Sequence, residues 1–290
     1  FELGINSPEV LFAVEFKSSV IDHAYDAYVR PSGDTKELGK QVYSGFVPTS
    51  ELVDSYEMAG DGGNFSWEKH GKDPYANREP RFYATILYNG ADWMGRKIES
   101  FVGGKDGYKA YENAGAAGTT VTGYYLRKYL IDGDKTWVTS GSGQDWIVLR
   151  YAEVLLNKAE ALAMENWNKN SAEALQALND VRARVGLPAR ATADKETFLE
   201  YVRHERKVEL AGEGFRYWDL RRWRLAEKVI DGQNVHGVKI SKQSDGSFTY
   251  EQVDADGGHK RIFYDRYYRF AIPLSERSNN SLCTNNDGWI

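Results

Sequence analysis

The pattern of apolar residues changes near residue 145, which restricts the chain to folds whose strands and helices occupy separate stretches. Before this point, residues 11–16 and 81–88 read as strands, and Asn89-Gly90 predicts a turn after the second. Grouped strands followed by grouped helices indicate an α+β fold rather than the βαβ alternation of a parallel sheet. We therefore expect a mainly α, α+β protein with a loop- and strand-rich ligand-binding region over 1–144 and a helical region over 145–290.

The helical region begins with an expected hairpin. Apolar residues recur at spacings of three and four from Ile147 to Leu162, which predicts an amphipathic helix. A second helix should begin at Ser171 and end at Gly186, because glycine favours the left-handed cap that closes helices. The pair spans about 35 residues, the length of one tetratricopeptide repeat, although an ordinary helical hairpin has the same pattern. Further helices are expected over 195–211 and 215–230, and a closing strand over 267–273.

Composition and charge exclude several classes of protein. With 37 basic and 42 acidic side chains, the chain lacks the basic excess typical of proteins that bind nucleic acid or anionic membranes. Cys283 is the only cysteine, so no disulfide can form within the chain. No stretch approaches the ~18 apolar residues that a membrane-spanning helix requires. Residues 1–6 do not resemble a targeting segment, so we expect the natural start to lie outside this sequence.

Three carboxylates could form an active site. Glu205, Glu209 and Glu213 are spaced by four, so they share one helix face, and two of them could act as the acid and base of a glycosidase. Arginines close to them in sequence would keep the carboxylates ionised, which favours an ion-pair network over a general acid. These arginines are Arg206, Arg216, Arg221 and Arg222. We therefore expect a structural face and a protein that is not an enzyme.

The sequence contains no recognisable metal or cofactor motif. The five histidines lack partners at the spacing of a zinc site, and no Walker loop, Gly-x-Gly-x-x-Gly fingerprint or Gly-x-Ser-x-Gly elbow occurs. Residues 254–258 begin like a calcium loop, but Gly258 stands where its fifth position needs a carboxylate, which favours a surface turn. We therefore expect neither a metal nor a cofactor.

Aromatic side chains in polar loops are the strongest candidates for function. Tryptophans at positions 67, 93, 137 and 146 lie in or beside Gly-rich or polar segments. Such a ring can stack on the C–H face of a sugar while neighbouring polar groups bind its hydroxyls, but it can equally fold back onto the core. The ligand-binding residues expected from loop position are Trp67, Trp93 and Tyr75, with Asn64, Asp92 and Arg96 as polar partners.

Five stretches, in order, resemble motifs of the SusD/RagB family. The stretches are 73–83 (DPYANREPRFY), 145–161 (DWIVLRYAEVLLNKAEA), 178–188 (LNDVRARVGLP), 205–223 (with ERKVEL and EGFRYWDLRRW) and 270–276 (with FAIP). Within the first stretch, Glu79 stands where Asp is more usual. The resemblance covers essentially the whole chain but only the C-terminal part of the family. It implies a SusD-like fold of tetratricopeptide-type hairpins packed with a loop-rich region containing short strands.

The resemblance also implies a function and a location. Members are lipid-anchored proteins of the bacterial outer membrane that bind glycans at the cell surface without cleaving them. They deliver the nutrient to a SusC-like TonB-dependent transporter, their usual partner. Cys283 lies too close to the C-terminus to carry the lipid, so membrane attachment would need an anchor outside this chain. Three alternatives stay open, namely capture of peptides or another nutrient, glycoside hydrolysis, and a protein that only caps the transporter.

Overall fold

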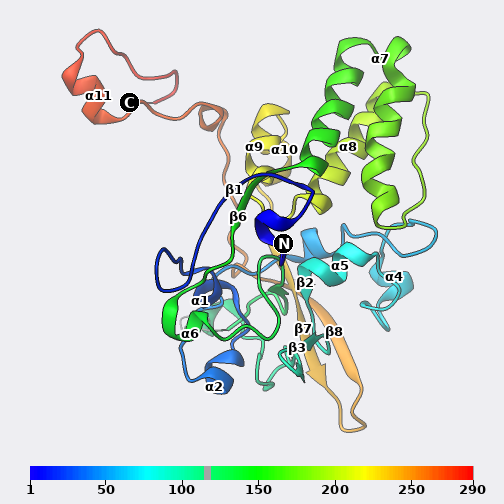
Figure 1. The fold of residues 1–290 in the computed structure, drawn as a ribbon, viewed down its shortest axis with the longest axis vertical. Helices are drawn as coiled ribbons and strands as arrows, with labels where there is room; N and C mark the ends of the chain where they lie inside the picture. Colours follow the sequence, from blue (N-terminus) through cyan, green and yellow to red (C-terminus); the bar gives the residue numbers. More distant parts are fainter. Residues whose placement is uncertain (114–118, 290) are drawn as a thin grey trace.

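The computed structural model describes residues 1–113 and 119–289 (Figure 1). The two longest helices, α7 (Tyr151–Arg184) and α8 (Lys195–Glu209), gather at one end, while short strands and loops fill the other end. The C-terminal residues, which include α11 (Leu274–Asn279), run away from this body as an extended tail. Among the described residues, no helix combines the length and apolar character needed to cross a membrane.

The expected helical hairpin is confirmed as two antiparallel arms of α7. The arms meet at Asn166, whose backbone angles (φ −161°, ψ 95°) are not helical. Asn166 Oδ1 accepts a hydrogen bond from the Lys169 backbone N–H at 3.2 Å, so Asn166 caps the second arm and Ser171 lies inside it. The arm ends before Gly186, which has a positive φ of 71° as the sequence predicted.

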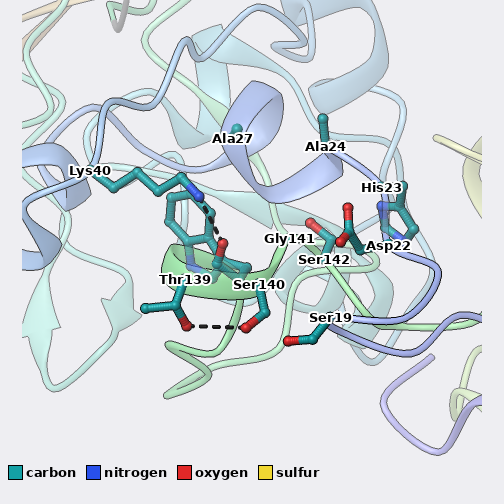
Figure 2. Close-up of a pocket in the computed structure, with 11 residues that line it drawn as sticks. Ser19, Asp22, His23, Ala24, Ala27, Lys40, Thr139, Ser140, Gly141 and Ser142 are labelled. Carbon is teal, nitrogen blue, oxygen red and sulfur yellow. Dashed lines mark hydrogen bonds between the residues drawn. The ribbon is translucent and has the colours of Figure 1, made fainter.

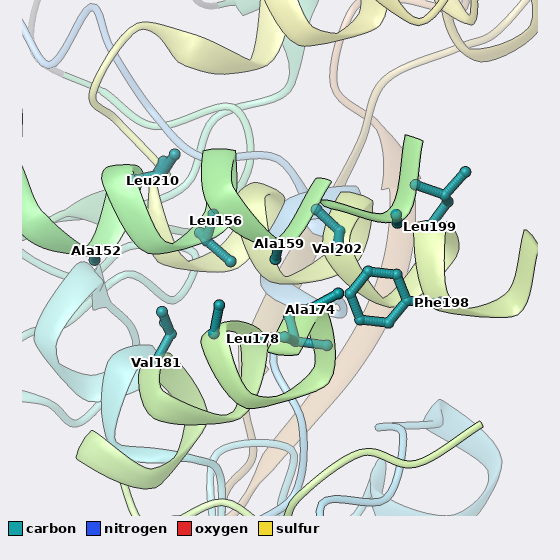
Figure 3. Packing of buried hydrophobic residues seen from close by; sticks show 12 residues of the cluster. Ala152, Leu156, Ala159, Ala174, Leu178, Val181, Phe198, Leu199, Val202 and Leu210 are labelled. Atoms are coloured by element: carbon teal, nitrogen blue, oxygen red, sulfur yellow. The ribbon is translucent and has the colours of Figure 1, made fainter. Parts of the chain in front are cut away.

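The hairpin packs on α8 through small side chains (Figure 3). Alanines on both arms of α7 let the helix backbones approach, and larger residues of α8 fill the space between them. Asp194 caps α8 by accepting a hydrogen bond from the Thr197 N–H at 2.7 Å. The core residues shown in Figure 3 include Ala152, Leu156, Ala159, Ala174, Leu178, Val181, Phe198, Leu199, Val202 and Leu210.

The expected start of the first helix is wrong, because the residues before α7 form a strand. Strand β6 (Trp146–Arg150) pairs antiparallel with β1 (Val10–Val14). Aromatic and β-branched residues in β6 suit a pleated strand, and β1 supplies the partner, with Val10 opposite Arg150 and Val14 opposite Trp146. Beyond the ladder, the Phe16 N–H donates a hydrogen bond to the Asp145 side chain. This ladder joins both sides of residue 145, and the division into regions 1–144 and 145–290 stays a prediction.

The strand expected over 81–88 is mostly wrong as well. Residues Pro80–Thr85 form a short helix, α5, and only β2 (Ile86–Leu87) is extended, paired with β5 (Tyr125–Leu126). Proline suits the first helical position, and a helix turns Phe82 and Thr85 to the same buried side. The expected turn at Asn89-Gly90 is confirmed, with Gly90 at φ 90°.

The C-terminal elements differ most from the expectation. The helix expected over 215–230 is divided into α9 (Phe215–Arg222) and α10 (Ala226–Ile230), and Arg224 between them has a positive φ of 56°. The expected closing strand is absent over residues 267–273, which the structure describes in full; part of it lies in a 3-10 helix, Asp265–Tyr268. A hairpin that the sequence patterns did not reveal pairs β7 (His236–Lys242) with β8 (Phe248–Asp254).

The loop-rich end is built from short elements around two apolar clusters. Val238 and Ile240 of β7 pack against Val53, Tyr56 and Phe82 in one cluster. The second cluster holds α1 and the β3–β4 hairpin together. The short elements are α1 (Tyr25–Val29), α2 (Asp34–Leu38), α3 (Ser50–Val53), α4 (Trp67–His70), β3 (Asp92–Trp93), β4 (Arg96–Lys97) and α6 (Trp137–Ser140), with 3-10 turns at Gly4–Asn6 and Tyr111–Asn113.

Candidate functional site

Two of the expected ring platforms, Trp93 and Tyr75, lie in the core. Trp93 is 1% exposed, and its Nε1 donates a hydrogen bond to Asp34 Oδ2 at 3.0 Å. Tyr75 is 6% exposed and packs against Phe82 and Tyr88 at centroid distances of 6.3 and 4.6 Å. The expectation that these two rings face a ligand is therefore wrong, because apolar contacts inside the protein already cover them.

The other four expected residues lie in two separate places. Trp67, half-buried on α4, donates from Nε1 to Asp54 Oδ2 at 2.9 Å, and the exposed Asn64 precedes the same helix. Asp92 and Arg96 lie in the β3–β4 hairpin, where Asp92 forms an exposed ion pair with Lys97 at 2.7 Å. The structure therefore brings Trp67 near Tyr75, since both contact Tyr250, but does not join them to Asp92 and Arg96. Ligand binding by Trp67, Asn64, Asp92 and Arg96 stays a prediction.

A pocket of about 760 Å³ lies between α1, α6 and the loop before α1 (Figure 2). Its polar groups are a carboxylate, an ammonium group and several hydroxyls, supplied by Asp22, Lys40, Ser19, Thr139 and Ser140. This mixture offers both donors and acceptors, as a ligand rich in hydroxyl groups requires. We call this cavity the hydroxyl pocket.

Backbone pairing fixes the walls of the hydroxyl pocket. His23 and Ser142 exchange backbone hydrogen bonds of 3.0 and 2.8 Å, which ties the loop before α1 to the segment after α6. Lys40 Nζ donates to the carbonyl oxygens of Trp137 and Val138 at 3.0 and 2.7 Å. The Lys40 ammonium also lies 5.4 Å from the centre of the buried Trp137 ring. The backbone pair and the Lys40 hydrogen bonds therefore hold two parts of the pocket wall in place.

Three exposed aromatic rings lie beside this pocket, and we call them the aromatic platform. Tyr28 on α1 is 45% exposed, and Tyr43 and Phe46 from the next loop are 45% and 63% exposed. Tyr28 stacks on Tyr43 at 5.2 Å and meets Phe46 edge-on at 6.3 Å. The Tyr43 N–H donates to the carbonyl of Ala27, a residue that lines the hydroxyl pocket. The platform and the pocket therefore share α1.

A buried arginine holds α1 in place beneath the platform. Arg30 is fully buried, and its Nε donates to Asp26 Oδ1 at 2.7 Å. Its guanidinium lies 5.2 Å from the ring centres of both Trp93 and Trp137. These charged hydrogen bonds and cation–π contacts hold the Arg30 side chain, which closes the C-terminal end of α1, in one position. Trp93 therefore contacts the arginine that closes α1, and its buried ring is covered by the protein itself.

The aromatic platform is a candidate binding feature that the sequence did not predict. Tyr43 and Phe46 stand among polar residues and glycine, which is the same signal that pointed to the loop tryptophans. Tyr28 gave no such signal, because it lies in a segment whose neighbours Tyr25 and Val29 suit a packed helix. Only the tertiary fold brings the three rings together.

The carboxylates of α8 and the turn after it lie in an ion-pair network, as expected, but with different partners. Glu209 pairs with Arg150 at 2.6 Å and with Arg81 at 3.0 Å, and Glu213 pairs with Arg150 and Lys128. Burial alone would raise the pKa of Glu209, but these arginine charges outweigh burial and hold the pKa far below its usual range. A carboxyl group kept ionised in this way is unsuited to act as a general acid.

The arginines nearest in sequence do not supply this network. Arg206 and Arg222 both pair with Asp219, at 2.8 and 2.9 Å. The cations of the network come instead from distant segments, since Arg81 lies on α5 and Arg182 lies at the end of α7. Arg182 joins Glu205 to Glu57 of the loop-rich region, at 3.0 and 2.9 Å.

Comparisons with known proteins agree on one family. The family model described as the SusD family matches residues 8–289. A SusD-like protein of Formosa agariphila is 32% identical over 133 residues, which is 42% of this chain and 25% of the relative. A SusD-like protein of Bacteroides fragilis has a similar structure, with a TM-score of 0.78 and 25% identity, over 100% of this chain and 56% of its own.

A second structure from Bacteroides fragilis, of a SusD-like carbohydrate-binding protein, gives a TM-score of 0.76 and 27% identity over 95% of this chain and 54% of its own. The chain thus spans about half the length of the solved structures it matches. Since the family model covers nearly all of its residues, the chain belongs to the SusD family.

Proposed function

We propose that this chain binds a glycan across the aromatic platform and the hydroxyl pocket without cleaving it. The observation that carries the proposal is the set of three exposed rings beside a polar pocket, in which Tyr28 contacts both Tyr43 and Phe46. Sugar rings present apolar C–H faces that stack on aromatic rings and hydroxyls that need hydrogen-bond partners. A similar structure is described as that of a carbohydrate-binding protein, which supports a sugar ligand for this scaffold.

The cellular role we propose follows from family membership. The protein would sit at the bacterial cell surface, attached to the outer membrane by a lipid anchor outside this chain. There it would pass its glycan to a SusC-like TonB-dependent transporter for nutrient uptake. Binding without catalysis agrees with the ion-paired state of Glu205, Glu209 and Glu213.

A double substitution of the platform tests the proposal. After a glycan array identifies a ligand, calorimetry should show that Tyr43→Ala with Phe46→Ala weakens binding by roughly tenfold or more. The melting temperature should hardly change, because exposed side chains contribute about 0.5 kcal/mol or less to stability. A matched control replaces Tyr151 and Tyr264, which are exposed aromatics away from the platform, by alanine.

The outcomes separate the remaining alternatives. Equal affinity in the platform and control variants would place the ligand elsewhere, with Trp67 as the next site to test. Release of shortened sugars from the bound glycan would establish a hydrolase. If no glycan on the array binds but peptides do, the protein captures another nutrient. If neither glycans nor peptides bind, a protein that only caps the transporter remains.

A further inference from the structure

A second pocket, of about 320 Å³, lies between α2 and the glycine-rich loop at residues 103–107. Lys36 of α2 lines one side, and Lys105 and Lys109 line the other. No carboxylate lines it among the residues that the structure describes. Three lysines among the residues that line one small cavity contrast with a chain whose net charge is −5. We call this cavity the lysine pocket.

The acidic groups nearest the lysine pocket are mostly engaged elsewhere. Asp106 belongs to the glycine-rich loop, but its side chain is buried. It pairs with Arg96 at 2.6 Å and accepts a hydrogen bond from the Gly33 N–H at 2.9 Å. Glu37 lies 3.2 Å from Lys105 Nζ, in a half-exposed pair that contributes little. Within the described part of the chain, Lys36 and Lys109 have no carboxylate within ion-pair distance. Glu99 also accepts a hydrogen bond from the Lys105 backbone N–H at 3.2 Å, so carboxylates offset part of the charge near Lys105. The positive charge of the pocket is therefore least compensated at Lys36 and Lys109.

One loop forms a wall of both pockets. Lys40 lines the hydroxyl pocket and the next residue, Gln41, lines the lysine pocket. The Val42 N–H donates to Thr35 Oγ1 at 3.1 Å, which holds this loop against α2. Tyr43 of the platform follows directly. Tyr43 is two positions after Gln41 and three after Lys40, so the platform and both cavities share this loop.

We propose that the lysine pocket binds an anionic substituent, a sulfate ester or a uronate carboxylate, of the glycan whose uncharged part lies on the aromatic platform. The inference rests on the proposed function and adds the class of glycan. Lysine ammonium groups form short, charge-assisted hydrogen bonds with sulfate and carboxylate oxygens. A Cβ at Gly103 would meet no atom within 4 Å, so the space there is open, whereas a Cβ at Gly104 would lie 2.2 Å from the Glu99 carbonyl oxygen, so glycine there allows the loop to fold tightly. Binding of this kind weakens as salt rises, because the lysines are exposed.

Paired probes test this inference. Affinity electrophoresis and calorimetry would compare dextran, xylan and galactan, each with its sulfated derivative, together with polygalacturonate and inorganic sulfate. We expect at least one charged polysaccharide to bind more tightly than its neutral counterpart. Replacing Lys36, Lys105 and Lys109 by glutamine should weaken that binding roughly tenfold or more and reduce its dependence on salt. Preference for the sulfated probes or for polygalacturonate identifies the anion.

A matched triple variant controls for net charge. Replacing the exposed Lys69, Lys72 and Lys228 by glutamine removes the same charge away from the pocket and should leave affinity unchanged. Equal losses in both triple variants, or no charged probe bound at all, would overturn the inference. If neutral glycans bind and only the platform variant weakens their binding, the proposed function is supported and the inference about the lysine pocket is overturned. If the lysine variant alone loses binding and the platform variant does not, the platform is wrong and the lysine pocket stands.

Discussion

At the scale of single residues, Arg30 shows how strongly this protein depends on buried charge. Its guanidinium is fully enclosed, paired with Asp26 and hydrogen-bonded to the carbonyl of Asp134 at 3.0 Å. Arg30→Met would leave the buried carboxylate of Asp26 without its ion-pair partner, and Asp34 would keep only Arg96. We expect a loss of about 3–5 kcal/mol in the free energy of unfolding, measured by urea denaturation.

The control for Arg30 is an exposed arginine. Arg224 lies 3.7 Å from Asp265 in an open ion pair, so Arg224→Met should cost less than about 1 kcal/mol. Similar losses in the two variants would mean that burial does not determine the contribution of the Arg30 pairs.

Trp93 gives a second prediction at this scale, because the sequence and the structure assign it different roles. If Trp93 supports α1 from within the core, Trp93→Ala should lower the free energy of unfolding by about 3–5 kcal/mol. Replacing the half-buried Trp67 by alanine should lower the free energy of unfolding by less. Denaturation curves for both variants check this order, and a Trp93 variant as stable as the wild type would contradict the core position.

At the scale of elements, the accuracy of the sequence prediction depends on the length of each pattern. The α7 hairpin and α8 were predictable because apolar spacing repeats over several turns and each helix has a recognisable end. Residues 81–88 are too short to separate strand from helix by pattern, and Pro80 decides the outcome. The platform was out of reach, since its rings come together only when the loop at 40–46 folds along α1.

The bend in α7 makes a prediction at this scale. Asn166→Ala removes the side chain that accepts a hydrogen bond from the Lys169 N–H, so the second arm loses its cap. We expect a loss of about 1 kcal/mol in thermal or urea unfolding. Asn168→Ala, two residues further along an exposed helix surface, is the control and should change stability little. Equal losses of stability in the two variants would show that the Asn166 cap contributes nothing specific to the stability of the second arm.

At the scale of the whole molecule, the ion-pair network links segments that are far apart in sequence. Glu57, Glu209 and Glu213 have pKa values below the ordinary 4.5, although burial would raise them. Hydrogen bonds with His204 and Arg182 and the charges of Arg182 and Arg190 lower the pKa of Glu57, and arginine and lysine partners lower the other two. Carboxyl groups with a lowered folded-state pKa contribute stability above the unfolded pKa and lose it as the pH falls. Burial raises the pKa of Glu79 and Asp54, which opposes this trend in part.

The pH dependence of unfolding follows. The melting temperature should fall steeply as the pH drops below about 4.5, and Glu209→Gln should lower it at pH 7 while making the acid slope shallower. Calorimetric scans between pH 7 and pH 3 check both effects. A melting temperature that stays constant through this range would show that the network does not stabilise the fold.

The β1–β6 ladder has a consequence for the order in which the chain folds. Strand β1 cannot pair until residues 146–150 have been synthesised, so it waits while most of the first half emerges. During that time the backbone N–H and C=O groups of β1 remain an open strand edge, which is a template for aggregation, and the side chains of Leu11, Phe12 and Val14 are exposed even in the folded protein. Folding of the first half therefore depends on an element of the second half, and a chain truncated before Trp146 would keep that edge permanently open.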